Sequence, residues 1–128
     1  MNTKYETSFQ VFPHHCNPLM PRIFGGALWG LMDTAAHTTV LRLLHDSECN
    51  QAVTYKTLGV TFFAESNLGD IIFLYCEVVE LRKKGVSVKV VAEKEQPGIP
   101  GRTKVAEDTL IFCTKKDGKF LAHGLSMD

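Results

Sequence analysis

The stretch GGALWGLMDTAAHTTVLRLLH, residues 25–45, decides the fold of this 128-residue chain. It is the one long helical pattern in the sequence, and its apolar residues cover more than one face. A helix that is apolar on nearly all sides is buried in the protein, so we expect other elements to wrap around it. At 1.5 Å per residue, such a helix is ~30 Å long.

The segments that could wrap this helix have the composition of strands. They are rich in Val, Ile, Phe, Thr and Tyr, and turn residues bound each of them. We predict strands over residues 4–12, 54–64, 71–81, 85–94, 104–114 and 119–123. The order predicts an α+β fold, in which one long central helix is wrapped by an antiparallel sheet of five to six strands.

The chain contains no internal repeat, low-complexity tract or linker that would divide it. A length of 128 residues fits one core, so we predict a single domain over residues 1–128. One helix leaves the edges of the sheet uncovered. We therefore expect association through a strand edge, giving at least a homodimer.

The net charge is zero, with 14 Lys and Arg against 14 Asp and Glu. This balance argues against a general nucleic-acid binder, which would have an excess of basic residues. Residues 81–119 nevertheless hold ten basic and five acidic residues. This surplus indicates either a solvated strand edge or a local site for an anionic ligand.

The chain starts MNTKYETSFQ, which has no apolar signal core, and no apolar run reaches the ~18 residues of a membrane span. We expect a cytoplasmic protein without a membrane partner. The cysteines lack C-x-x-C spacing, so we expect small buried side chains rather than a metal site. They are Cys16, Cys49, Cys76 and Cys113.

Asp33 is the first candidate for chemistry, because it lies in the middle of the apolar helix pattern. A buried carboxylate costs several kcal/mol unless it is paired. Asp33 could face solvent, or pair with His37 one turn later. The functional interpretation is a general base or a nucleophile.

Two other features could bind an anion. Phe24-Gly25-Gly26 starts the helix, where free N–H groups stabilise a phosphate or an oxyanion; the glycines could equally serve packing. The run Arg82-Lys83-Lys84-Gly85-Val86-Ser87 suits a phosphate, or is a solvated turn.

Upstream of the helix, His14, His15, Cys16 and Asn17 form a polar cluster that suits acid–base chemistry or an ordinary turn.

The segment IFGGALWGLMDTAAH resembles the helix motif of hot-dog-fold acyl-CoA thioesterases, in which an [HF]-G-G element precedes a mid-helix Asp. The segments VTFFAESNLGDIIFLYCEVVELRKKGVSVKVVAE and VAEDTLIFCTKKDGK resemble strands of that family. The likeness extends from about residue 14 to residue 123. It implies hydrolysis of an acyl-CoA thioester to a free acid and CoA, with no cofactor, since CoA is part of the substrate.

The resemblance also implies roles for individual residues. Asp33 matches the catalytic carboxylate, and Gly25 the residue whose backbone N–H polarises the thioester carbonyl. Thr34 matches a hydroxyl after the Asp, and Asn17 a loop Asn, although Asn17 stands one residue further from the glycine pair than expected. CoA phosphates are expected at the turn formed by Lys83, Lys84, Gly85, Val86 and Ser87. Active sites of the family form at a dimer interface, and the dimers assemble into tetramers or hexamers.

One departure concerns the strand expected to contain Leu58 and Gly59, where some members place a polar side chain facing the site. Here only Thr57 and Thr61 stand nearby.

Two alternatives remain. HHCNPLMPR has some likeness to the loop of dehydratases and hydratases that act on acyl chains linked to acyl carrier protein or CoA. Those enzymes need an acid about six residues after the second Pro, where this chain has Ala27. A non-catalytic acyl-CoA binder is the other alternative, and its signature would be loss of the helix Asp.

Overall fold

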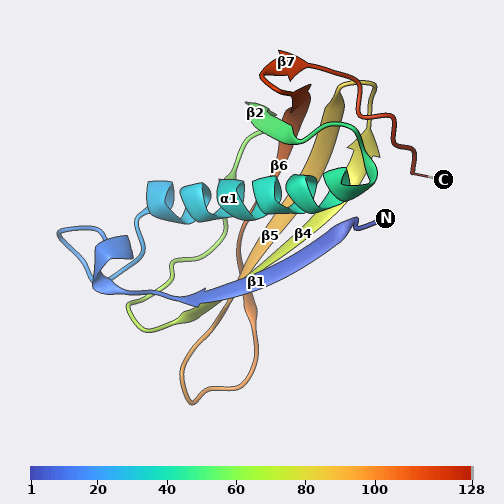
Figure 1. Cartoon of the computed structure of the whole chain (residues 1–128). Helices are drawn as coiled ribbons and strands as arrows, with labels where there is room; N and C mark the ends of the chain where they lie inside the picture. The colour runs from blue at the N-terminus through green and yellow to red at the C-terminus, as the bar shows by residue number, and fades with distance from the viewer. Residues whose placement is uncertain (128) are drawn as a thin grey trace.

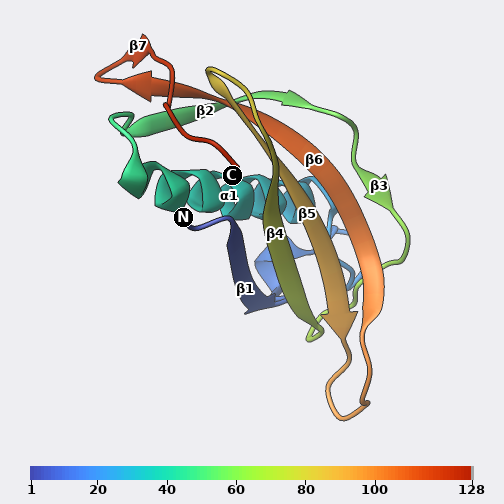
Figure 2. The same ribbon diagram turned by 90° about the vertical axis from the view of Figure 1, so that its right-hand side faces the viewer.

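The computed structural model describes residues 1–127. Its long helix, α1 (Gly25–Leu43), lies across one face of a single antiparallel sheet (Figure 1). Seen after a rotation of 90°, the sheet curls around the helix (Figure 2). This arrangement confirms the predicted α+β fold, and its helix begins at the predicted residue.

The long strands run in the order β1-β4-β5-β6-β2, and the short strands β3 and β7 each pair with β6. The sheet therefore has seven strands within residues 1–127 rather than five to six, because the segment predicted as one strand over residues 54–64 contains parts of two, β2 and β3. The strands are β1 (Lys4–Gln10), β2 (Gln51–Thr57), β3 (Thr61–Phe62), β4 (Ile71–Leu81), β5 (Gly85–Glu95), β6 (Thr103–Lys116) and β7 (Lys119–Phe120).

The prediction of one strand over residues 54–64 is wrong. Its N-terminal part is β2, which begins at Gln51 and ends at Thr57, and its C-terminal part is β3. Gly59, with φ of +120°, lies between them in a conformation that favours glycine and interrupts the ladder. Leu58 and Gly59 therefore belong to a linker and not to a strand.

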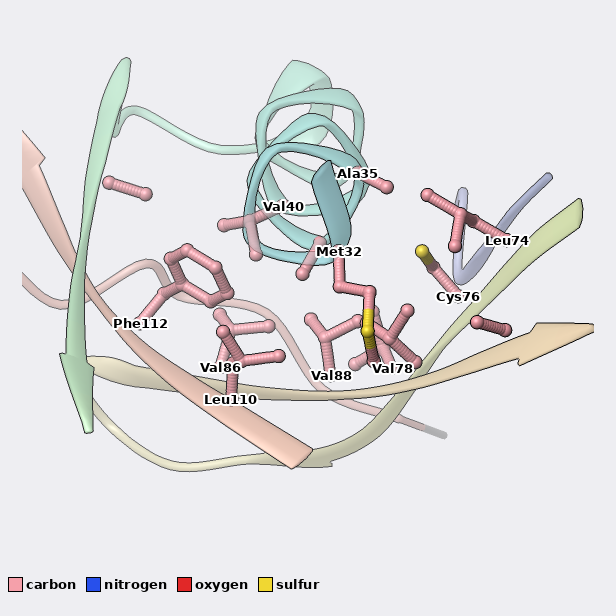
Figure 3. Packing of buried hydrophobic residues seen from close by; sticks show 14 of the residues in the cluster. Met32, Ala35, Val40, Leu74, Cys76, Val78, Val86, Val88, Leu110 and Phe112 are labelled. Atoms are coloured by element: carbon pink, nitrogen blue, oxygen red, sulfur yellow. The ribbon is translucent and has the colours of Figure 1, made fainter. Parts of the chain in front are cut away.

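The core lies between α1 and the inner face of the sheet. One helix face carries Met32, Ala36 and Val40 at a spacing of four residues, and all three are fully buried. Figure 3 shows Met32 pointing from the helix toward Val78 and Val88 of the sheet. Cys49 and Cys76 are buried in this core as predicted, whereas Cys16 and Cys113 are half-buried.

The two edges of the sheet differ in chemistry. On β1 the exposed side chains are polar, at alternate positions from Lys4 to Gln10. On β2 and β3, exposed side chains include large apolar ones, with Tyr55 71% and Phe62 48% exposed. The edge formed by β2 and β3 is therefore the surface that would gain from being covered.

Candidate active site between the helix and the β2–β3 edge

A second face of α1 is directed at the β2–β3 edge. Gly25, Trp29, Asp33 and His37 follow one another at four-residue spacing, which places them one above the other on the helix surface. Gly25 lies next to Phe62 of β3, and Asp33 and His37 lie next to Thr54 and Ala52 of β2, whereas Trp29 meets Asp108 of β6. This face is polar where the core face is apolar, and it contains the main candidate residues.

Asp33 is half-buried, and its Oδ1 accepts a hydrogen bond of 2.7 Å from Thr54 Oγ1 on β2. Its other oxygen makes no hydrogen bond within residues 1–127. The alternative pair of Asp33 with His37 is not formed, because His37 Nε2 lies 2.9 Å from the carbonyl oxygen of Ala52 instead. Thr54 thus orients Asp33 and leaves one carboxylate oxygen available.

The helix start has the geometry of an anion site. No side chain caps it, and Leu28 N makes a 3.1 Å bond to Phe24 O, so the N–H groups of Gly25, Gly26 and Ala27 precede the first intrahelical bond. A Cβ added at Gly25 would lie 3.4 Å from the Phe62 ring, an ordinary contact. A Cβ at Gly26 would lie 2.9 Å from the ring of Phe24, an exposed side chain that would have to shift.

Asn17 lies in the loop before the helix. Its Oδ1 accepts a 2.9 Å bond from Leu19 N, which is the geometry of an ordinary Asx turn. Its side-chain amide NH₂ has no hydrogen-bond partner in the described part of the chain. The loop is fixed to the helix start by the bond from Phe24 N to His15 O.

His15 belongs to the structure of this loop. Its Nδ1 accepts a 3.0 Å bond from Phe12 N. Partial burial and then the neighbouring His14 lower the pKa of His15, which favours the neutral ring that this bond requires.

Thr34 follows Asp33 but is exposed on another side of the helix. Its Oγ1 donates a 3.0 Å bond to Gly30 O one turn earlier. Within one chain, Thr34 is therefore not brought to the oriented Asp33–Thr54 pair.

Of the residues predicted to form a basic turn, Lys83 and Lys84 lie between β4 and β5, whereas Gly85, Val86 and Ser87 are the first residues of β5. The side chains of Lys83 and Lys84 are exposed, while Val86 is fully buried and presents only its backbone. Val86 pairs with Phe112, and Phe112 pairs with Thr54. The turn therefore starts two strands, roughly 10 Å, from Thr54.

Two residues next to the site face, Thr54 and Asp108, were missed as site residues by sequence reasoning. Thr54 contacts Asp33, whereas the predicted Thr57 contacts Asp108 and the predicted Thr61 lies on β3. Trp29 Nε1 donates a 2.9 Å bond to Asp108 Oδ2. Asp108 stood in the predicted strand 104–114, where an acidic residue amid apolar inward-facing positions was the available signal.

Within residues 1–127, no group of three or more His, Cys, Asp or Glu side chains is arranged to hold a metal ion. None of the helices in this part of the chain is long and apolar enough to cross a membrane.

The model of a family described as the thioesterase superfamily matches residues 20–100. A comparison with curated proteins gave no match.

Solved structures of several thioesterases are similar to the chain. An acyl-CoA hydrolase from Staphylococcus aureus, in complex with butyryl coenzyme A, coenzyme A and coenzyme A disulfide, is 24% identical with a TM-score of 0.84, over 95% of this chain and 71% of the other. A hexameric thioesterase from Yersinia pestis is 18% identical with a TM-score of 0.83, over 94% of each chain. The S. aureus enzyme was also characterised as single alanine variants of an asparagine, a threonine and an aspartate. The shared architecture confirms the predicted hot-dog fold.

Proposed function

The chain belongs to the thioesterase superfamily, and we propose that it hydrolyses an acyl-CoA thioester to a free carboxylic acid and CoA. The observation that carries this proposal is the half-buried Asp33, which Thr54 orients on an open face of the helix. A carboxylate held in this way can accept a proton from an attacking water molecule. The S. aureus hydrolase, in which an asparagine, a threonine and an aspartate were each replaced, supports a role for the same residue types here: Asn17, Thr54 and Asp33.

Asp33 can promote thioester hydrolysis by two routes. As general base, Asp33 takes a proton from water while the water oxygen attacks the thioester carbon; the C–S bond then breaks and the proton passes to the CoA thiolate. As nucleophile, Asp33 attacks the thioester carbon, the C–S bond breaks and CoA leaves as the thiolate, which gives an anhydride between Asp33 and the acyl group. Water then hydrolyses the anhydride to the free acid and the Asp33 carboxylate, and the proton released from water passes to the thiolate. Either route gives the acid and CoA and requires no cofactor.

The N–H groups at Gly25 are suited to stabilise the oxyanion that forms on the carbonyl. Gly25 and Asp33 are eight residues apart on one helix, which corresponds to ~12 Å. Both groups must lie within hydrogen-bonding reach of the same thioester, so one helix cannot supply both. We infer that Gly25 of one copy faces Asp33 of another.

Two antiparallel α1 helices would bring these groups together. The helices would cross near Trp29 and Gly30, midway between Gly25 and Asp33. A Cβ at Gly30 would meet nothing within 4 Å, so the helix has room for a close approach at that point. The exposed apolar side chains of the β2–β3 edge would be covered in the same assembly, which supports a homodimer as the smallest active unit. Dimers could assemble further, as the hexameric relatives do.

The turn of Lys83, Lys84, Gly85, Val86 and Ser87 is suited to the phosphates of CoA. Two exposed ammonium groups and the Ser87 hydroxyl offer donors to an anion. We expect Lys83→Gln combined with Lys84→Gln to raise KM for CoA esters more than it lowers kcat. An unchanged KM would exclude the phosphate role.

The function is tested by incubating the protein with short, long, branched and aromatic acyl-CoAs, and with an acyl-carrier-protein thioester. We expect thiol release with at least one of them, and a loss of at least 100-fold in kcat for Asp33→Asn. Circular dichroism and gel filtration should show an unchanged fold and oligomer. Near-full turnover by Asp33→Asn on every accepted ester would contradict the proposal. Hydration of an enoyl-CoA would favour the hydratase alternative, and binding without turnover would favour the non-catalytic one.

A further inference from the structure

A second carboxylate lies in the interface between α1 and the β2–β3 edge. Asp108 on β6 is only 3% exposed. Its Oδ2 accepts a 2.9 Å hydrogen bond from Trp29 Nε1 and another bond from Thr57 Oγ1 at the end of β2. Thr57 Oγ1 in turn accepts a 3.2 Å bond from Gly59 N. One carboxylate thus fixes the indole ring, the end of β2 and the start of the linker to β3.

The burial of the Asp108 carboxylate is not explained by a contribution to the stability of the fold. None of the four ion pairs within residues 1–127 includes it, and its Oδ1 is buried without a hydrogen-bond partner there. Burying a charged group without a counter-charge or a complete set of hydrogen bonds is unfavourable. Such a departure from ordinary core chemistry is typical of a residue retained for function.

The position of Trp29 in the helix indicates the function of Asp108. Trp29 lies one turn after Gly25 and one turn before Asp33, so its backbone is ~6 Å along the helix from each of them. In the assembly proposed above, a thioester held between Gly25 and Asp33 would lie beside Trp29. Asp108 fixes the indole from the sheet side, and through Thr57 it also fixes the strand that carries Thr54.

We propose that Asp108 is a specificity-determining positioning residue, which sets the position of the Trp29 indole and thereby the acyl chains that can reach Asp33. This inference rests on the proposed thioesterase activity. It assigns Asp108 no contact with the reacting atoms. Its effect therefore falls on the choice between acyl groups and not on the chemical step common to all of them.

The sole tryptophan of the chain makes the contact measurable without substrate. Asp108→Leu removes the acceptor, and we expect a shift of the Trp29 emission and stronger quenching by acrylamide. Asp108→Asn keeps one acceptor oxygen and should largely restore both signals. Thr114→Val serves as a matched control, because Thr114 is also a buried residue of β6, and its hydroxyl donates to Leu121 O and not to Trp29.

The activity arm compares kcat/KM for butyryl-CoA and for a long-chain acyl-CoA. We expect the ratio to change at least tenfold in Asp108→Leu, to return toward wild type in Asp108→Asn, and to stay constant in Thr114→Val. Trp29→Phe should change the ratio in the same direction, and Trp29→Phe with Asp108→Leu should change it no further, because both act through one ring. Trp29→Phe also keeps the test decisive if Asp108→Leu does not fold.

An altered emission with an unchanged ratio would overturn the proposal, since the indole would then be positioned without selecting substrate. An unchanged emission in folded Asp108→Leu would overturn it as well. If the wild-type protein hydrolyses none of the esters, the proposed function fails, while the emission arm still reports the Trp29–Asp108 contact.

Discussion

Met32 and Asp33 are neighbours in the sequence, yet they lie on two faces of α1 with different properties. Met32 belongs to the core face, which packs apolar side chains against the sheet without exposed surface. Asp33 belongs to the site face, where Asp33 and His37 form hydrogen bonds to the edge strand β2. The core face holds the helix in place, and the site face can therefore carry groups that contribute little to stability.

The largest effect expected on the site face is on catalysis. Gly25→Pro removes the backbone N–H that we assign to the oxyanion, and we expect kcat to fall about 100- to 1,000-fold. Proline is tolerated at the first position of a helix, and the extended backbone of Phe24 (φ −75°, ψ 133°) suits a residue before proline.

Gly25→Ala is the matched control for this change. It keeps the N–H and adds only an ordinary contact with Phe62, so kcat should stay close to wild type. Equal losses of kcat in both variants would show that the added side chain, and not the missing N–H, lowers the activity. The backbone N–H of Gly25 would then have no catalytic role.

The corresponding change on the core face should act on stability. Met32→Ala leaves a cavity at a fully buried position, and we expect the free energy of unfolding to fall by about 2–5 kcal/mol. Urea denaturation measures this loss, with Asp33→Asn beside it as the variant expected to change stability far less. If Asp33→Asn is as destabilised as Met32→Ala, the two faces are not separable as described.

Thr54→Val tests the orientation of Asp33 with a smaller expected effect. The variant keeps the shape of the side chain and loses the donor to Asp33 Oδ1, so we expect a decrease of about tenfold in kcat. Thr54 is exposed in the single chain, so little change in stability is expected. A kcat equal to wild type would remove Thr54 from the site.

The smallest effect concerns pH and the core. Burial raises the pKa of the Cys76 thiol from 9.0 to about 11, against the opposing hydrogen bond of Thr39. A pKa that is higher in the folded state stabilises the protein below pH 9, and this stabilisation is lost as the pH rises toward 11.

We therefore expect the wild type to lose roughly 1–3 kcal/mol more stability than Cys76→Ala between pH 9 and pH 11. Parallel denaturation curves at the two pH values measure the difference. Equal losses would show that the thiol beside the core face titrates as if it were exposed.

The sequence predicted the two faces unequally, for a physical reason. Apolar periodicity specifies the core face, so the start of α1 and the bounds of β4 agree with the prediction. Contacts on the site face join residues far apart in the chain: Thr54 with Asp33, and Asp108 with Trp29. Which threonine meets Asp33 depends on the register of β2 and on its end before Gly59, and periodicity does not specify either.

The central claim is that one active site takes Asp33 from one copy of the chain and Gly25 from another. Mixing Asp33→Asn with Gly25→Pro under conditions that exchange subunits tests it directly. Heterodimers would hold one intact site of two, so we predict recovery of about one quarter of wild-type activity at equal amounts of the two variants. A mixture of Asp33→Asn with the double variant Asp33→Asn/Gly25→Pro should recover nothing. If the first mixture shows only the averaged residual activity of its two components despite confirmed exchange, each chain carries its own complete site and the account is contradicted.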